Sequence, residues 1–174
     1  MKVAVVAYNP NWRKNFALES SQIAKALGKN VVFIHHIGST AIPNIYAKPI
    51  IDFLVEVRDI DRVNEKNAAM EALGYEALGE FGLVGRRYFR KEHPPGIRTH
   101  HVHTYQVGSP EIERHLAFRD YLLAHPEDAQ KYGELKLKLA QKYPEDIEGY
   151  INGKDEFVKE IEKKAIQWRI LNLD

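Results

Sequence analysis

Several features that would assign this chain to a protein class are missing from its sequence. It contains no cysteine, which excludes disulfide bonds, thiolate metal sites and a cysteine nucleophile. It has no apolar run of about 18 residues and no signal-peptide pattern near its start. Walker A, Gly-x-Gly-x-x-Gly and His-Glu-x-x-His motifs are also absent. We therefore expect no membrane partner and a cytoplasmic location, and any metal ligands must be histidine, aspartate or glutamate.

The chain also carries little net charge. Its 25 Lys and Arg residues against 24 Asp and Glu residues give a formal charge of +1 at pH 7. Such a balance predicts no bulk attraction to nucleic acid or to an anionic membrane. A length of 174 residues fits one domain and is sufficient to bury an ordinary hydrophobic core. The sequence leaves the oligomeric state open.

Hydrophobic periodicity predicts an α/β fold with a mixed sheet. Apolar or alternating runs predict strands over residues 3–7, 31–37, 50–57, 75–78, 86–90 and 99–107. Helical spacing with Gly and Pro boundaries predicts helices over residues 10–27, 59–73, 110–124, 126–143 and 144–172. Glycines at positions 79, 82 and 85 predict a flexible loop. We expect a single domain over residues 1–174, with a core over about residues 1–108 and a helical layer over about residues 109–174.

The most informative segment joins a Gly-Ser turn to a carboxylate on the following strand. Gly38 permits close approach of a ligand to the backbone, and Ser39 offers a hydroxyl and can cap a following helix. A helix that begins at Ser39 would present free N–H groups to an anion. Asp52 and Glu56 are four residues apart, so both side chains point to one face of the strand.

The role of Asp52 has two interpretations. Burying a carboxylate is costly unless it has a partner, so Asp52 is either a metal ligand or general base, or one half of an ion pair with Lys48 or an arginine. For Glu56 the favoured interpretation is a solvated or paired carboxylate.

Two histidines form the second candidate group. His101 and His103 are two residues apart on a predicted strand and therefore share a face, whereas His100 points the other way. Paired imidazoles suit a metal ion or a phosphate. The alternative is that they are polar side chains on an exposed sheet face.

Basic and aromatic residues complete the candidates. The basic set, whose members suit phosphate but also form ordinary surface ion pairs, comprises Lys48, Arg86, Arg87, Arg90, Lys91 and Arg119. Arg87 and Lys91 are expected to share a strand face. Tyr132 with Lys136, and Tyr150 with Lys154, are i,i+4 pairs on predicted helices. They either line a cleft or pack lysine stems over tyrosine rings.

The central segment also carries a family resemblance. The run His36-Ile37-Gly38-Ser39-Thr40-Ala41-Ile42-Pro43 with Lys48-Pro49-Ile50-Ile51-Asp52 resembles the central motif of the GrpB family, a member of the nucleotidyltransferase superfamily. The likeness continues through Tyr8-Asn9-Pro10-Asn11-Trp12, Phe118-Arg119-Asp120-Tyr121-Leu122, Tyr132-Gly133-Glu134-Leu135-Lys136, and Tyr150 with Lys154. It implies a nucleotidyltransferase-like core followed by a helical layer. It also implies a nucleotide or another phosphorylated small molecule as ligand.

The sequence departs from the active-transferase motif at one position. Where that superfamily has Asp-x-Asp, this chain reads Ile50-Ile51-Asp52, so the resemblance does not extend to two-metal nucleotidyl transfer. A further carboxylate expected on a later strand is also missing, because no Asp or Glu lies between Glu92 and Glu111. Histidine is the candidate replacement.

These observations predict a reduced site. Asp52 and His103 are the predicted catalytic residues, and a single divalent cation, Mg or Mn with Zn also open, is expected on Asp52, His101 and His103. The predicted ligand-binding residues are Gly38, Ser39, Lys48, Arg87 and Arg119. The Gly38-Ser39 turn is expected to converge with Asp52 and His103 on one pocket. The alternative function is a non-catalytic module that binds a ligand or a protein partner. The isoleucine at position 50, in place of the first aspartate, favours this alternative. In the family that the chain resembles, a related domain is fused to dephospho-coenzyme A kinase in some bacteria, which indicates a supporting role there.

Overall fold

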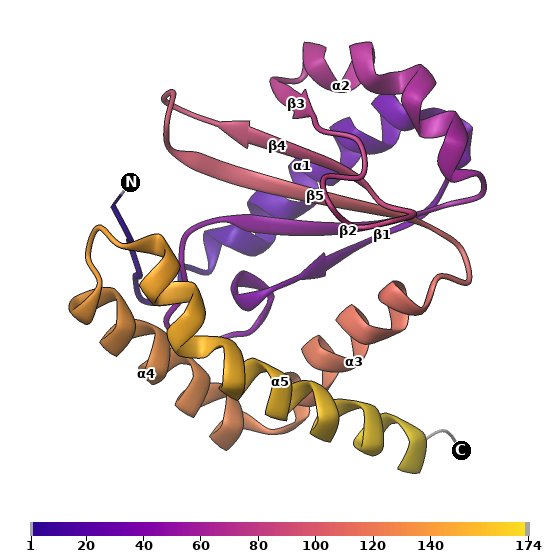
Figure 1. Ribbon diagram of the computed structural model, residues 1–174. Coiled ribbons are helices and arrows are strands. Elements are labelled where there is room, and N and C mark those ends of the chain that lie inside the picture. The colour runs from indigo at the N-terminus through magenta and orange to yellow at the C-terminus, as the bar shows by residue number, and fades with distance from the viewer. Residues whose placement is uncertain (1, 173–174) are drawn as a thin grey trace. The chain divides into compact units, whose positions relative to one another are not determined.

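The computed structural model describes residues 2–172, and within them it contains five helices and one five-stranded mixed sheet (Figure 1). The strands are β1 (Val31–Ile37), β2 (Ile51–Val57), β3 (Tyr75–Ala77), β4 (Arg87–Glu92) and β5 (Arg98–Gln106). The helices are α1 (Asn11–Leu27), α2 (Asn67–Ala72), α3 (Pro110–Ala124), α4 (Pro126–Lys142) and α5 (Ile147–Leu171). The predicted fold class, a mixed α/β sheet with C-terminal helices, is confirmed.

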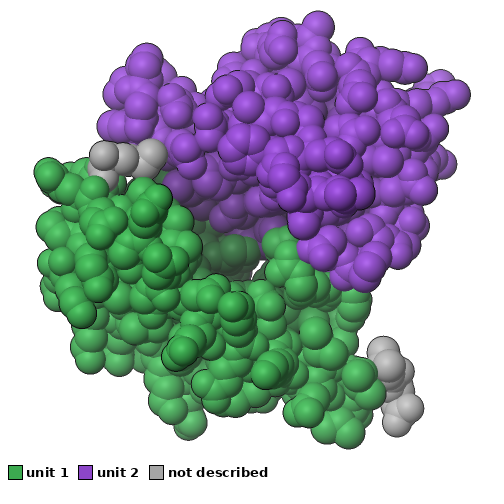
Figure 2. Space-filling model, viewed as in Figure 1, with its two compact units in different colours: residues 1–10, 38–49, 113–174 green, residues 11–37, 50–112 purple. Residues whose placement is uncertain are grey.

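The chain forms two compact units, coloured separately in Figure 2. Unit 1 comprises residues 1–10, 38–49 and 113–174, and unit 2 comprises residues 11–37 and 50–112. Unit 2 holds the sheet with α1 and α2, and unit 1 holds α4 and α5. Residues 38–49, which we expected in the sheet-containing core, belong to the unit that contains these C-terminal helices.

The sheet of unit 2 has the strand order β1-β2-β5-β4-β3. β2 and β5 run parallel, and the other neighbouring pairs are antiparallel. Asp52 lies opposite His101, which lies opposite Arg90, while His103 lies opposite Tyr88. Because residues directly opposite one another point to the same face, these five side chains share one face of the sheet. We call it the Asp52 face.

The other face of the sheet is the apolar side of unit 2. Successive strand residues point to opposite faces, so the apolar residues that alternate with Asp52 in β2 all point away from it. They join buried residues of α1, α2, β4 and β5 in one cluster that includes Ile23, Leu27, Ile51, Phe53, Val55, Val57, Met70, Phe89 and Val102. This core fixes the register that places Asp52 beside the histidines.

The core of unit 1 brings α4 against the segment of residues 38–49. Ile42 and Ile45 of that segment are buried in one cluster with Ala129 and Tyr132 of α4. Gly133 makes the close approach possible, because a Cβ atom there would lie 2.9 Å from the backbone nitrogen of Tyr46 and 3.0 Å from the Cβ of Ile45.

Gly133→Ala is therefore expected to lower the free energy of unfolding by about 1–3 kcal/mol. Alanine has the better helix propensity by about 1 kcal/mol, but its methyl group meets the backbone of Tyr46, which cannot move aside as a flexible side chain would. Urea denaturation measures the change. Glu134→Ala, at the next and exposed position of α4, is the control. Equal stability of both variants would show that α4 moves without penalty.

One local prediction is wrong, and a second is correct in its Asp59 cap and its end near Leu73 but not in its first turns. Residues 3–7 form no strand of the sheet, since they make only an isolated antiparallel bridge between Val6 and Ala47. The partner segment is flanked by Pro43 and Pro49, and proline limits a ladder because it has no N–H to donate. The helix expected over residues 59–73 begins instead as a 3-10 helix over Ile60–Lys66, whose Asp59 cap accepts a bond from the Asp61 amide at 3.0 Å.

Candidate functional site

The Gly38-Ser39 turn, in unit 1, is tighter than the sequence suggests. Gly38 has φ 74°, a conformation that glycine adopts without strain. Ser39–Ala41 is a single 3-10 turn. The Ala41 amide donates to the Gly38 carbonyl and the Ile42 amide donates to the Ser39 carbonyl, both at 3.1 Å. The expected helix N-terminus is therefore wrong, because the element is too short and these two amides are already bonded within the turn.

The side chain of Lys136 in α4 lies against this turn. Its Nζ donates to the Ser39 hydroxyl at 2.5 Å and lies 4.3 Å from the centroid of the Tyr132 ring. Lys136 is only 2% exposed. Lysine is rarely buried to this extent, and burial of an ammonium requires polar or aromatic contacts in compensation. The structure thus fixes a positive charge at the one hydroxyl that the sequence motif singles out.

Two further lysines flank a buried tyrosine of the same unit. The Nζ atoms of Lys48 and Lys154 lie 5.4 Å and 5.2 Å from the centroid of the Tyr150 ring. Tyr150 is 0% exposed, and within the described residues its hydroxyl has no hydrogen-bond partner. Burial raises the pKa of Tyr150 well above its usual value, so the hydroxyl is a donor at neutral pH. A buried hydroxyl without a partner is unfavourable, and an oxygen atom of a ligand would satisfy it.

The two sets meet at their tyrosines, because Tyr132 adds to the effect of burial in raising the pKa of Tyr150. We call these side chains and the turn the lysine cluster: Gly38, Ser39, Lys48, Tyr132, Lys136, Tyr150 and Lys154, all in unit 1. It combines ammonium groups with hydroxyl groups. Ammonium and hydroxyl donors suit an oxyanion such as phosphate.

A second constellation lies on the Asp52 face of unit 2. The Oδ1 atom of Asp52 is 3.3 Å from Nε2 of His103 and 3.5 Å from Nδ1 of His101. The other ring nitrogen of His101, Nε2, is buried and has no hydrogen-bond partner among the described residues. Tyr88 packs against both histidines, with ring centroids 5.7 Å from His101 and 5.3 Å from His103. The expectation that β5 places its histidines beside Asp52 is confirmed.

The charge of Asp52 follows from these contacts. Burial raises its pKa, but the hydrogen bonds and charges of His101 and His103 more than offset this, so the pKa of Asp52 lies well below its usual range. Burial, followed by the negative charge of Asp52, raises the pKa of Tyr88. At neutral pH the Asp52 face therefore presents a carboxylate that two imidazoles hold in place, next to a neutral phenol.

The metal expectation rests on Asp52, His101 and His103, and both histidines contact the carboxylate. The three donor groups are directed at one another, and among residues 2–172 no group of three or more His, Asp or Glu side chains is arranged to hold a metal ion. Whether the protein takes up a cation together with a ligand stays a prediction.

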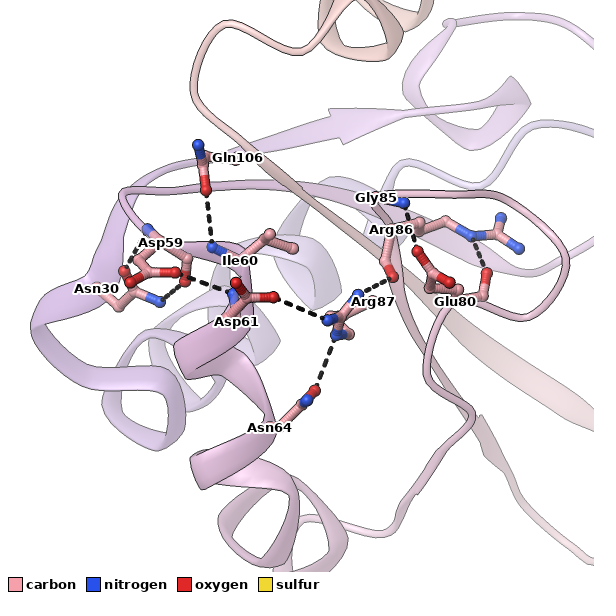
Figure 3. A network of polar contacts seen from close by, with 10 residues as sticks. All are labelled: Asn30, Asp59, Ile60, Asp61, Asn64, Glu80, Gly85, Arg86, Arg87 and Gln106. Atoms are coloured by element: carbon pink, nitrogen blue, oxygen red, sulfur yellow. Dashed lines mark hydrogen bonds and ion pairs between the residues drawn. The ribbon is translucent and has the colours of Figure 1, made fainter.

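The structure places one predicted ligand residue, Arg87, away from the Asp52 face. Arg87 and Lys91 do share a face of β4, but the register puts Arg87 opposite Thr104, on the apolar side of the sheet. Figure 3 shows Arg87 bonded instead to Asn64 at 2.8 Å and to Asp61 at 3.4 Å. Since β4 alternates, the arginine that shares the face of Asp52 is Arg90. Arg87 thus lies on the opposite face from Asp52, and its assignment to the ligand stays a prediction.

Other predicted residues have partners of their own. Arg119, another predicted phosphate ligand, pairs with the adjacent Asp120 at 2.8 Å. Glu56 contacts His35 at 2.5 Å, which confirms the interpretation of a paired carboxylate. The predicted convergence of Ser39 with Asp52 and His103 stays a prediction.

Two residues have contacts that the sequence does not indicate. The spacing of Lys136 predicts only its pairing with Tyr132, because nothing in it indicates a contact with Ser39, 97 positions away. Tyr88 was not singled out at all. The sequence feature that could have indicated Tyr88 is the alternation of Arg86, Tyr88 and Arg90. Alternate residues of a strand lie on one side of it, so this spacing places an aromatic side chain between two basic ones.

Fold and site together define a mixed α/β protein with a basic cluster in one unit and an Asp-His-His group in the other. The GrpB protein family matches residues 2–164, and the chain belongs to this family. It is 37% identical to the glutamate-rich protein GrpB of Alkalihalophilus pseudofirmus, over 92% of this chain and 94% of that protein. It also resembles the crystal structure of the conserved protein GrpB from Enterococcus faecalis. The TM-score is 0.90 and the identity 49%, over 94% of this chain and 98% of that chain.

Some relatives are longer than this chain. The UPF0157 protein YqkA of Bacillus subtilis is 49% identical over 97% of this chain, which spans only 48% of that protein. The dephospho-CoA kinase of Mycobacterium tuberculosis is 25% identical over 94% of this chain and 46% of the kinase. None of the helices in the described part of the chain is long and apolar enough to cross a membrane.

Proposed function

We propose that this GrpB-family protein binds a phosphorylated small molecule, with a nucleotide as the leading class, through the lysine cluster. The observation that carries the proposal is the buried ammonium of Lys136, which donates to the Ser39 hydroxyl beside the positive-φ Gly38. In this proposal a phosphate oxygen accepts from the ammonium and the hydroxyl, and Lys48 and Lys154 supply further positive charge.

Packing alone gives a weaker account of the cluster. Lysine stems commonly cover aromatic rings while the ammonium reaches solvent. Lys136 is different, because its charged end is itself buried and meets a serine. The unpartnered hydroxyl of Tyr150 is a second feature that packing leaves unexplained, and an oxyanion accounts for both.

The resemblance to nucleotidyltransferases supports the same class of ligand. The Gly38-Ser39 pair resembles the Gly-Ser motif of that superfamily, and one relative bears the name of a kinase. The chain lacks the first metal aspartate at Ile50. We therefore expect no two-metal transfer, in which adjacent cations need several bridging carboxylates. Binding, with or without a later chemical step, is the function we infer.

Catalysis is the second candidate, and the Asp52 face favours it. Asp52 contacts Nε2 of His103, and a carboxylate that orients an imidazole is a common arrangement in general acid–base catalysis. In this role His103 accepts or donates the proton and Asp52 stabilises its charged form. His101 holds Asp52 from the other side, as a positioning residue.

The test is a titration of the wild-type protein with phosphorylated compounds, followed by isothermal calorimetry. The panel comprises inorganic phosphate, ribose 5-phosphate and nucleoside mono-, di- and triphosphates, each with and without magnesium, manganese or zinc. We expect saturable binding of at least one organic phosphate, in competition with inorganic phosphate. Chromatography of the same mixtures separates the two candidates, because turnover supports catalysis and binding without turnover supports a binding module. Absence of any binding would overturn the proposal.

A further inference from the structure

The lysine cluster of unit 1 has two parts. In the first part, the Lys136 ammonium of α4 contacts the Ser39 hydroxyl at the Gly-Ser turn. In the second part, the ammonium groups of Lys48 and Lys154 both lie near the ring of Tyr150, at 5.4 Å and 5.2 Å from its centroid. Each part thus combines ammonium with one hydroxyl group, and this donor set suits an oxyanion.

The packing of α4 against α5 relates the two parts. The Tyr132 ring of α4 stacks on the Phe157 ring of α5, with centroids 5.8 Å apart and an interplanar angle of 7°. Further along α4, Leu139 packs so closely on Gly153 of α5 that a Cβ atom there would overlap its side chain. Because the second contact lies later in α4 but earlier in α5, the two helices run antiparallel, as Figure 1 shows.

Two lysines therefore occupy the same level of this helix pair. Lys136 of α4 and Lys154 of α5 both lie between the two interhelical contacts, one on each helix. Lys48 reaches the same region, since it shares the Tyr150 ring with Lys154. Ammonium groups that are held near one another repel, and anionic groups close to them relieve that repulsion. Three lysines in one cluster favour a ligand with more negative charge than one phosphoryl group carries.

The hydroxyl groups provide a second argument. The Ser39 hydroxyl already accepts from Lys136 and has a proton of its own to donate. The Tyr150 hydroxyl is buried and has no hydrogen-bond partner among the described residues, so it too is a donor that requires an acceptor. A ligand with two phosphoryl groups gives each of these hydroxyls an acceptor of its own.

We infer that the lysine cluster selects a ligand with two phosphoryl groups over the corresponding monophosphate. One phosphoryl group accepts from Lys136 and Ser39. The second accepts from the Tyr150 hydroxyl and from the ammonium groups of Lys48 and Lys154. A diphosphate ester and a bisphosphate both supply this chemistry, and they differ in the spacing of the two groups. The inference rests on the proposed function for the first phosphoryl group and extends it by the second.

Calorimetric titration with AMP, ADP and adenosine 3′,5′-bisphosphate tests the inference, because these compounds share a nucleoside and differ in their phosphoryl groups. Divalent cations are removed with EDTA, since a bound cation would neutralise part of the charge. Lys48→Met, Lys154→Met and Tyr150→Phe alter the second position, and Lys136→Met alters the first. Lys163→Met is the control, because Lys163 is an exposed lysine of the same helix as Lys154. Urea denaturation verifies that each variant is folded.

We expect wild-type protein to bind ADP or the bisphosphate at least about tenfold more tightly than AMP, the usual increment of one charged hydrogen bond. Lys48→Met and Lys154→Met should remove most of this preference and leave the affinity for AMP nearly unchanged. Tyr150→Phe, which keeps the buried ring, should reduce the preference in the same direction. Lys136→Met should weaken the binding of all three compounds, and Lys163→Met should bind them as wild type does.

The possible failures of the two proposals differ. Equal affinity of wild type for AMP and for both compounds with two phosphoryl groups would overturn this inference and leave the proposed function intact. A preference that persists in Lys48→Met, Lys154→Met and Tyr150→Phe would also overturn it, because the second phosphoryl group would then bind elsewhere. Absence of binding by all three compounds would overturn the proposed function as well.

Discussion

Lys136→Met is expected to weaken the binding of a nucleoside monophosphate by about 10- to 100-fold, the usual loss for a charged hydrogen bond. Methionine keeps the length and much of the volume of lysine, so the packing around Tyr132 and Ser39 is largely preserved. The variant should be at least as stable as wild type, because it removes a buried charge. Loss of binding with unchanged or increased stability is the combination that identifies a ligand-binding lysine.

Lys138→Met is the matched control for this variant. Lys138 lies in the same helix, two positions further along, and is exposed. Calorimetric titration should give the wild-type affinity for Lys138→Met. If both variants bind as wild type, or if Lys136→Met unfolds at a much lower urea concentration, the ammonium supports the fold and takes no part in binding.

Asp52→Asn is expected to lower the free energy of unfolding by about 1–3 kcal/mol at neutral pH while leaving the protein folded. Asparagine retains the shape but not the charge that holds His101 and His103. The folded pKa of Asp52 is depressed, so its stabilisation is complete above the unfolded pKa of about 3.9 and is lost as the pH falls below it. The difference in the free energy of unfolding between wild type and Asp52→Asn should therefore become smaller as the pH decreases from about 5. We call this difference the stability gap.

Urea denaturation across this pH range measures the gap. Asp155→Asn is the control, because Asp155 pairs with Lys159 on the exposed surface of α5 and should show little gap at any pH. A gap for Asp52→Asn that does not change with pH would contradict a depressed pKa. We also expect Asp52→Asn to weaken binding of a phosphorylated ligand or cation. Unchanged binding by the folded variant would make Asp52 a structural carboxylate only.

The sequence predicted those parts of the fold that depend on local pattern. Strands over residues 31–37 and 99–107 and helices bounded by Pro110 and Pro126 match within about one residue, since apolar period and proline positions determine them. The strand expected over residues 3–7 failed because pairing depends on the partner segment, which local hydrophobicity does not describe. Local sequence pattern also does not predict the register between neighbouring strands. That register determines that Arg90, and not Arg87, shares a face with Asp52.

In the site, too, contacts that follow from local spacing were predictable and contacts that depend on tertiary packing were not. His101 and His103 follow from strand alternation, and the Tyr132–Lys136 and Tyr150–Lys154 pairs follow from helical spacing. The contact between Ser39 and Lys136 required the close packing of α4 that Gly133 permits. Two residues that meet only through tertiary packing leave no signal in a single sequence.

A crystal structure with bound ribose 5-phosphate tests the central claim most directly. The account predicts phosphate density within hydrogen-bond distance of the Ser39 hydroxyl and the Lys136 ammonium, with Lys48 or Lys154 alongside. Phosphate bound elsewhere, for example in the surface pocket lined by Lys29, Arg58 and Arg62, with the Ser39–Lys136 contact undisturbed, would contradict it.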